Sequence, residues 1–171
     1  QTILKAKVRF SFSTNGLLLT KEIVDWLNSL PNAVVNVTID GNKIMHDAHR
    51  RTISGAGSYD IIIKNLRLFR DAYPDFYRDR VRFLSTVYSW NEVLKLADVW
   101  DEELALKEHY PVHISHIIPN FNDKSRVYDT WEVKNIFYKK AFEAYKQGDK
   151  GILAGCFQKL IDIVDNRNYL I

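Results

Sequence analysis

A hydroxyl, a carboxylate and a guanidinium lie close together in this sequence, and these groups suit the binding of a polar ligand. The segment AVVNVTID, residues 33–40, contains Thr38 and Asp40, and Arg50 follows ten residues after Asp40. A Thr hydroxyl both donates and accepts hydrogen bonds, and the planar guanidinium of Arg presents a fork of donors that matches a carboxylate. Asp40 and Gly41 also suit a simple turn, so the carboxylate has a purely structural interpretation as well.

A second polar turn, STNG at residues 13–16, ends an earlier strand-like segment. Ser13 and Asn15 are candidates for the wall of a ligand cavity. The alternative is that Asn15 and Gly16 only form a tight turn, because an Asn-Gly pair tolerates positive φ.

Two histidines raise the question of a metal. His46 and His49 are spaced one helical turn apart, as in some metal sites, but no Cys, Asp or Glu stands at an obvious partner position. We therefore expect structural or supporting roles for both histidines and no metal ligands in this chain. The nearby GAGSYD lacks the Lys-Ser/Thr of a P-loop, so we expect it to open a helix.

Composition excludes several classes of function. The 171 residues carry a net charge of only +3, which gives no argument for nucleic acid or an anionic membrane as a partner. No apolar run approaches the ~20 residues that cross a bilayer. The single cysteine, Cys156, excludes an internal disulfide and favours a reducing, cytoplasmic compartment. Its apolar neighbours indicate a buried position.

Strand-like and helical segments alternate along the chain. We expect strands at residues 7–14, 33–40, 81–88 and 112–118. Helices are expected from Thr20 to about residue 30, from Ser58 to residue 73, after a Ser89–Glu92 capping box, at 130–147 and at 150–166. Pro74 should end the second of these helices, and residues 120–129 should form a loop.

This order predicts an α/β fold with parallel strands and crossover helices. Helices cover one face if the sheet curls into a barrel and both faces if it stays flat, and the sequence pattern does not choose between the two. In either case a ligand should bind at the carboxyl ends of the strands.

Two strand ends resemble a known family. STNG, and then TIDG followed by IMHDAHR and GAGSYD, resemble the middle of a radical S-adenosylmethionine domain. The similarity is to the peptide- and protein-modifying branch that includes the anaerobic sulfatase-maturating enzymes. There a TNG-type turn ends the third strand, and S-[LI]-D-G, I-H-D-x-x-R and G-x-G-[ST]-[FY] follow the fourth. The resemblance implies a partial (β/α)6 TIM-like barrel, of which this chain is about strands three to six.

The resemblance also implies roles for individual residues. Thr38 matches the strand-four Ser of the family and Arg50 matches its cofactor-contacting Arg, so both are expected to bind S-adenosylmethionine. Asp40 would lie near the substrate, while no catalytic residue is assigned. Ser13 and Asn15 would line the cavity, and Ile118 at the end of the last strand would lie against the adenine.

The family also needs parts that are not in this chain. Its [4Fe-4S] cluster is held by a CxxxCxxC motif, and a single thiolate cannot hold such a cluster. We expect residues 1–171 to be one partial domain, with the later part of the barrel at about 7–119 and linking helices at about 130–166. Alone it should bind no cluster and catalyse nothing.

Two functions remain open at this point. The first is a parent enzyme that uses a 5′-deoxyadenosyl radical, with electrons from a flavodoxin- or ferredoxin-type reductant, to modify a peptide or protein. A thioether or carbon–carbon crosslink in a ribosomally made peptide, or formylglycine formation, would be the product. The second is a stand-alone, non-catalytic binding module with a degenerate form of the same fold.

Overall fold

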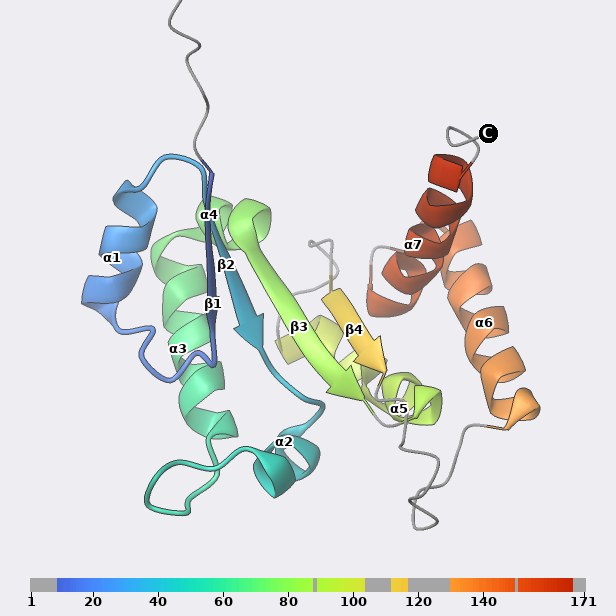
Figure 1. Ribbon diagram of the computed structural model, residues 1–171, viewed down its shortest axis with the longest axis horizontal. Coiled ribbons are helices and arrows are strands. Elements are labelled where there is room, and N and C mark those ends of the chain that lie inside the picture. Colours follow the sequence, from blue (N-terminus) through green and yellow to red (C-terminus); the bar gives the residue numbers. More distant parts are fainter. Residues whose placement is uncertain (1–8, 88, 104–111, 117–129, 150, 168–171) are drawn as a thin grey trace, which may run out of the picture.

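The computed structural model describes residues 9–87, 89–103, 112–116, 130–149 and 151–167. Within these ranges, four strands form one sheet in the order β1-β2-β3-β4, and every neighbouring pair is parallel. The strands are β1 (Phe10–Thr14), β2 (Ala33–Thr38), β3 (Val81–Val87) and β4 (Val112–His116). The expected α/β class with parallel strands and crossover connections is therefore confirmed (Figure 1).

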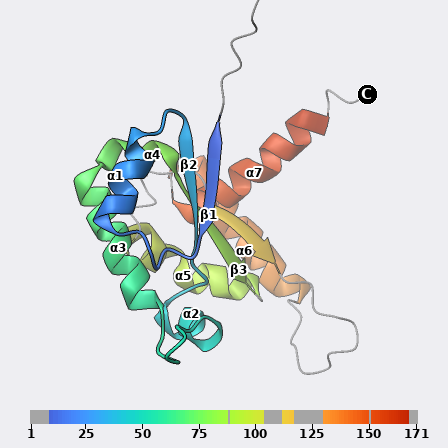
Figure 2. The ribbon, with the colours of Figure 1, turned by 60° about the vertical axis from the view of Figure 1, so that its left-hand side comes forward.

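Helices connect the strands and extend the chain beyond them. The helices are α1 (Lys21–Ser29), α2 (Lys43–His49), α3 (Tyr59–Ala72), α4 (Pro74–Arg80), α5 (Trp90–Glu103), α6 (Trp131–Lys146) and α7 (Ile152–Arg167). In Figures 1 and 2, α1, α3 and α4 lie together on one side of β1 and β2. The helices α6 and α7 pack against each other beyond β4, away from α1 and α3.

The expected helix after Ser58 ends before Pro74, but the chain does not then enter β3 directly. Pro74 occupies the first turn of α4, where its missing N–H costs nothing and its fixed φ suits a helix. Phe76 and Tyr77 of α4 are buried. The sequence pattern does not predict this helix, because a proline after a helix is normally a stop signal.

Alternation along β2 and β3 shows which face of the sheet the helices cover. Ala33, Val35 and Val37 are fully buried, whereas Asn36 and Thr38 are half-buried on the other face. The alternation continues in β3, where residues 81, 83, 85 and 87 are buried and residues 82, 84 and 86 are half-buried. Burial of one face under helices and a more polar second face are typical of a barrel wall.

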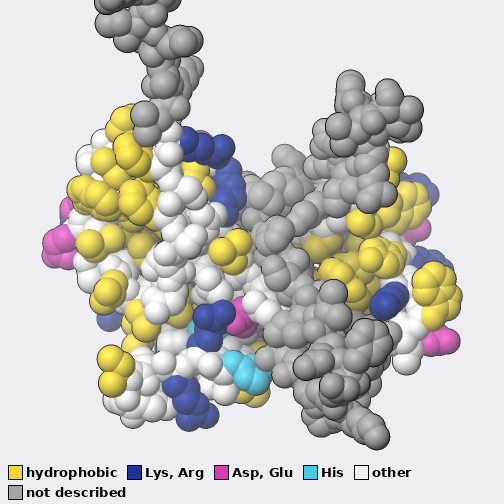
Figure 3. Space-filling model, viewed as in Figure 1, with side chains coloured by type: hydrophobic (Ala, Val, Ile, Leu, Met, Phe, Trp, Pro, Cys, Tyr) yellow, Lys and Arg dark blue, Asp and Glu magenta, His cyan; other side chains and the backbone are white. Residues whose placement is uncertain are grey.

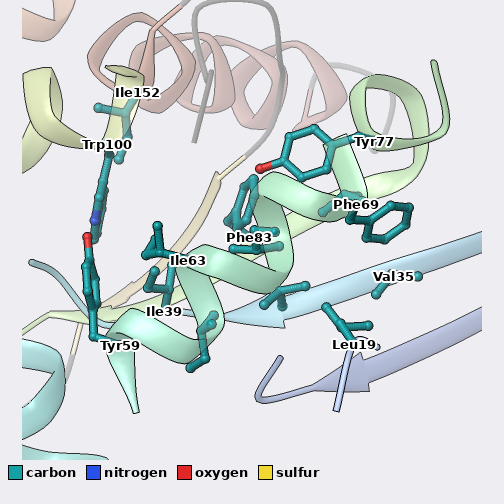
Figure 4. Close-up of a cluster of buried hydrophobic side chains, with 14 of the residues drawn as sticks. Leu19, Val35, Ile39, Tyr59, Ile63, Phe69, Tyr77, Phe83, Trp100 and Ile152 are labelled. Carbon is teal, nitrogen blue, oxygen red and sulfur yellow. The ribbon is translucent and has the colours of Figure 1, made fainter. Parts of the chain in front are cut away.

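The core lies between the sheet and the helices α1, α3, α4 and α5. Figure 4 shows Val35, Phe69 and Phe83 in this layer, with Trp100 of α5 at one end of it. Burial of these large side chains supplies most of the driving force for folding. Cys156 of α7 packs against this cluster, but it is only partly buried, whereas the sequence predicted a buried position.

Candidate functional site

A cavity of about 560 Å³ lies at the carboxyl ends of β2 and β3, where the connections to α2 and α5 begin. The described residues that line it are Asp40, Ile44, Met45, Ala48, His49, Arg50, Thr86 and Glu92. In Figure 3, basic, acidic and histidine side chains meet on this face beside residues that are not described. The cavity is therefore at the sheet edge where parallel α/β folds bind ligands.

Asp40 and Arg50 form an ion pair in the wall of this cavity. Nε of Arg50 donates to Oδ2 of Asp40, and the backbone N–H of Thr86 donates to Oδ1 of the same carboxylate at 2.8 Å. The Asp40 side chain is 13% exposed and that of Arg50 38% exposed. Among the described residues, none accepts a hydrogen bond from the terminal nitrogens of Arg50, and these two donors suit a carboxylate or hydroxyl of a ligand.

The conformation of the turn that carries Asp40 depends on a glycine and on a hydrogen bond from α5. Gly41 has a φ of +73°, a left-handed conformation that favours glycine. Its carbonyl accepts a hydrogen bond of 3.0 Å from Nε1 of Trp100, a buried residue of α5. The turn interpretation of Asp40 and Gly41 is thus correct, and Asp40 lines the cavity at the same time.

The short helix α2 connects the two members of the ion pair. Asn42 caps its start by accepting from the N–H of Met45 at 3.1 Å, and Arg50 is the residue that ends it. Ile44, which is 81% exposed, and Met45 contribute apolar side chains to the cavity lining. The cavity therefore combines a polar wall with an apolar edge, as small-molecule sites commonly do.

The segment between α2 and α3 contains the remaining motif residues. Oδ1 of Asp47 accepts from the N–H of Tyr59 at 2.9 Å and so caps α3. A Cβ at Gly57 would collide with the Asp47 carboxylate, which explains the glycine at this position. Burial acts to raise the pKa of Asp47, but the Tyr59 N–H and the Lys43 ammonium outweigh it, and the net direction is downward.

His46 is fully buried and hydrogen-bonded to Ser58, whose hydroxyl also bonds the carbonyl of Arg50. This contact supports the structural interpretation of His46. Ser58 occupies the N-cap position of α3 without capping it, because its hydroxyl is engaged elsewhere. Among the described residues, no group of three or more His, Cys, Asp or Glu side chains is placed to hold a metal ion.

Two other candidate residues lie in or next to the cavity region. Thr38 ends β2 on the half-buried face, two residues before Asp40, but it is not part of the cavity lining itself. Arg51, the neighbour of Arg50, is exposed, and its Nη1 donates to the carbonyl of Gly55 at 3.3 Å. The structure therefore distinguishes the two arginines, since only Arg50 lines the cavity.

The candidates of the first turn lie elsewhere. Ser13 is exposed on β1 opposite Asn36, and Asn15 is exposed in the turn that follows β1. Oδ1 of Asn15 accepts from the N–H of Leu17 at 3.2 Å, as in an Asx turn. Neither residue lines the cavity. Ile118 lies outside the described residues.

The sequence analysis did not identify Thr86, Glu92 or Trp100 as parts of the site. A signal for Thr86 existed, because it lies on the same face of β3 as Leu84, the residue opposite Thr38 in the sheet. Glu92 was noticed only as a capping residue, and its carboxylate does accept from the N–H of Ser89 at 3.3 Å. No local pattern pointed to Trp100.

The strand order and the cavity define a segment of a parallel α/β barrel with a polar site at its carboxyl edge. No family model and no curated protein matches the chain. Solved structures do match it, and those described below are of an anaerobic sulfatase-maturating enzyme of the radical S-adenosylmethionine class, anSMEcpe.

The histidine-tagged anSMEcpe with bound AdoMet gives a TM-score of 0.59 at 16% identity, covering 86% of this chain and 40% of that chain. Native anSMEcpe with bound AdoMet and the Cp18Cys peptide gives a TM-score of 0.61 at 17% identity, covering 86% of this chain and 41% of that chain. At such identities the likeness shows the fold alone, which matches part of a radical S-adenosylmethionine TIM-like barrel. The chain spans about two fifths of the length of these enzymes.

No helix among the described residues is long and apolar enough to span a membrane.

Proposed function

We propose that this chain is the later part of the catalytic barrel of a radical S-adenosylmethionine enzyme that modifies a peptide or protein side chain. The observation that carries the proposal is the Asp40–Arg50 pair in a cavity at the carboxyl edge of a sheet whose fold matches AdoMet-bound enzymes. A peptide also accompanies AdoMet in two of the similar structures, which supports a peptide or protein substrate. The products we favour are a thioether or carbon–carbon crosslink, or formylglycine.

The residues present fit one part of the cofactor. S-adenosylmethionine offers two ribose hydroxyls and a charged methionyl end, and Arg50 has terminal nitrogens that no described residue occupies. Thr38 supplies a hydroxyl at the end of the neighbouring strand. We assign the binding of the ribose or the methionyl carboxylate to Arg50 and that of a ribose oxygen to Thr38. Ile118 stays a candidate wall residue, whereas we assign no contact with the cofactor to Ser13 and Asn15, which lie outside the cavity lining.

The chemistry that this cofactor supplies, when bound beside a reduced [4Fe-4S] cluster, is abstraction of a hydrogen atom from the substrate. This chain contributes binding and orientation. Asp40 accepts from Arg50 and from the Thr86 backbone, which holds the guanidinium in one orientation at the cavity. We assign the cluster ligands to other parts of a longer polypeptide, because Cys156 is the single cysteine here. A flavodoxin- or ferredoxin-type reductant and a cytoplasmic location belong to the same proposal.

The test is the affinity of the natural full-length polypeptide for S-adenosylmethionine, measured by anaerobic titration calorimetry. Arg50→Ala should weaken binding about tenfold to a hundredfold, the cost of one or two charge-assisted hydrogen bonds. Arg50→Lys should recover only part of this loss, because an ammonium cannot reproduce the fork of the guanidinium. Arg51→Ala is the matched control and should bind as the natural protein does. Equal affinities for Arg50→Ala and Arg51→Ala would refute the site assignment.

A further inference from the structure

A continuous chain of hydrogen bonds joins Asp40, which precedes α2, to Arg50, which ends it. The backbone N–H of Asp40 donates to Nδ1 of His46 at 3.1 Å, and Nε2 of His46 lies 2.9 Å from Oγ of Ser58. The Ser58 hydroxyl donates to the carbonyl of Arg50 at 3.1 Å. This series of hydrogen bonds thus starts at the backbone N–H of Asp40 and ends at the backbone carbonyl of Arg50, its partner in the ion pair.

The directions of these bonds fix the tautomer of His46. A serine hydroxyl has one hydrogen, and the Arg50 carbonyl is an acceptor only, so Ser58 must use its hydrogen there. Ser58 therefore accepts from His46, which requires the proton on Nε2. Nδ1 faces a backbone N–H and must keep its lone pair. The neutral Nε2–H form is the one that satisfies all three bonds.

The surroundings of the ring favour this neutral form. The His46 side chain is fully buried, and the edge of the Tyr59 ring packs against it with the ring centroids 5.7 Å apart. Burial lowers the pKa of His46. The Asp40 and Asp47 carboxylates act to raise it and the Arg50 charge acts to lower it, and the net direction is downward.

We propose that His46 is a positioning residue that, as its neutral Nε2–H tautomer and through Ser58, sets the geometry of the Asp40–Arg50 pair at the cavity. Protonation of Nδ1 would place a second donor against the Asp40 N–H and break the first link. The pair should then lose its fixed orientation, and ligand affinity should fall as the pH is lowered. That the ligand is S-adenosylmethionine rests on the proposed function, whereas the effect on the ion pair does not.

Substitutions can separate the links, again in the natural full-length polypeptide. His46→Asn keeps an amide oxygen near the place of Nδ1 and loses the bond to Ser58. His46→Gln keeps a donor near the place of Nε2 and loses the bond from Asp40. Ser58→Ala removes the second and third links, and Ser58→Thr retains the hydroxyl. Ser54→Ala is the control, because Ser54 is an exposed hydroxyl on the same connecting segment.

The first readout does not depend on the cofactor. In protein labelled with ¹⁵N at His and Arg, the ring of His46 should give the NMR pattern of the Nε2–H tautomer near neutral pH. The Nε–H signal of Arg50 should shift and exchange faster with solvent in Ser58→Ala, recover in Ser58→Thr and stay unchanged in Ser54→Ala. An Nδ1–H tautomer, or an Arg50 signal that ignores Ser58→Ala, would overturn the inference whatever the protein binds.

The second readout is S-adenosylmethionine affinity as a function of pH. Ser58→Ala, which removes two hydrogen bonds of the chain, should weaken binding by about tenfold, and Ser58→Thr should restore it. The natural protein should lose affinity on acidification, and this dependence should disappear in His46→Asn, which has no titrating ring. If Arg50→Ala leaves the affinity unchanged while the Arg50 signal still responds to Ser58→Ala, the proposed function fails and the positioning role stands.

Discussion

Two turns of this protein look alike in sequence, since each ends a strand with polar residues and a glycine. The turn after β1 contains Asn15 and Gly16, and the turn after β2 contains Asp40 and Gly41. Both glycines adopt left-handed conformations, with φ of +81° and +73°. The two turns nevertheless use their polar side chains differently.

In the turn after β1, the polar side chains bond to residues of the same turn. Oγ1 of Thr14 accepts from the N–H of Gly16, and Asn15 accepts from that of Leu17. From α3, Nδ2 of Asn65 donates to the carbonyls of Gly16 and Leu17 at 3.0 and 3.1 Å. This turn joins β1 to the helix layer and places no side chain in the cavity.

In the turn after β2, the side chain of Asp40 instead bonds to residues of other elements. Thr86 of β3 bonds the Asp40 carboxylate, Trp100 of α5 bonds the Gly41 carbonyl, and Arg50 beyond α2 completes the pair. The difference indicates that a polar strand-end turn becomes a ligand site where other elements converge on its side chain. Glycine and polar type alone do not decide this.

The largest expected effect lies in the turn after β1. In Gly16→Ala, the new Cβ would lie 2.9 Å from Cγ2 of Ile62 and 3.1 Å from Cγ1 of Val37, in addition to the strained φ. We expect the free energy of unfolding to fall by about 2–4 kcal/mol, from overpacking and left-handed strain together. Urea denaturation of the natural full-length polypeptide would measure this.

Gly148→Ala is the matched control for that experiment. Gly148 has a similar φ of +74°, but nothing lies within 4 Å of the position of an added Cβ. It should therefore report the strain alone, about 1–2 kcal/mol. Equal losses at both sites would mean that Gly16 is required only for its φ and that its tight approach to α3 contributes nothing.

A smaller effect is expected at Trp100, whose indole N–H donates to the turn after β2. Trp100→Phe keeps an aromatic ring in the core but leaves the buried carbonyl of Gly41 without its donor. We expect a loss of about 1–3 kcal/mol in unfolding free energy. Because the same turn carries Asp40, the affinity for S-adenosylmethionine should fall as well, which calorimetry would show.

The affinity for S-adenosylmethionine should distinguish the turn after β1 from the turn after β2. Gly16→Ala, measured where the protein remains folded, should bind S-adenosylmethionine as the natural protein does, whereas Trp100→Phe should not. Loss of affinity in Gly16→Ala at a temperature well below its unfolding transition would contradict the separation of the two turns into one structural and one ligand-binding type.

Local patterns predicted much of the fold. Alternating and β-branched segments placed all four strands to within a few residues, as in AVVNVTID, where β2 ends at Thr38 rather than at Asp40. The starts of α1, α3, α5, α6 and α7 were also predicted to within about two residues, whereas α4 was not; Thr20 and Ser58 occupy N-cap positions without capping through their side chains. The choice between one and two covered faces needed the structure, because helices far along the chain decide it.

The site was predictable only in part. The resemblance drew attention to Asp40 and Arg50 because both belong to one short segment around α2, but it did not predict that they pair with each other. Thr86 contributes a backbone N–H and Trp100 an indole N–H from other elements, and contacts at such sequence separation leave no local pattern. Ser13 and Asn15 were chosen for their type and their place at a strand end, and the structure puts them outside the cavity lining.

The smallest expected effect is at Asn15 itself. In Asn15→Ala the Leu17 N–H loses an acceptor, but the site is exposed and water replaces the amide oxygen. We expect a loss of about 0.5–1 kcal/mol in unfolding free energy and no change in S-adenosylmethionine affinity.

Asp40→Asn is the counterpart in the other turn, because it retains the shape of the side chain and removes the charge that pairs with Arg50. It should weaken binding clearly, since the guanidinium loses the ionised partner that orients it. A binding defect in Asn15→Ala as large as that of Asp40→Asn would mean that the first turn also reaches the ligand.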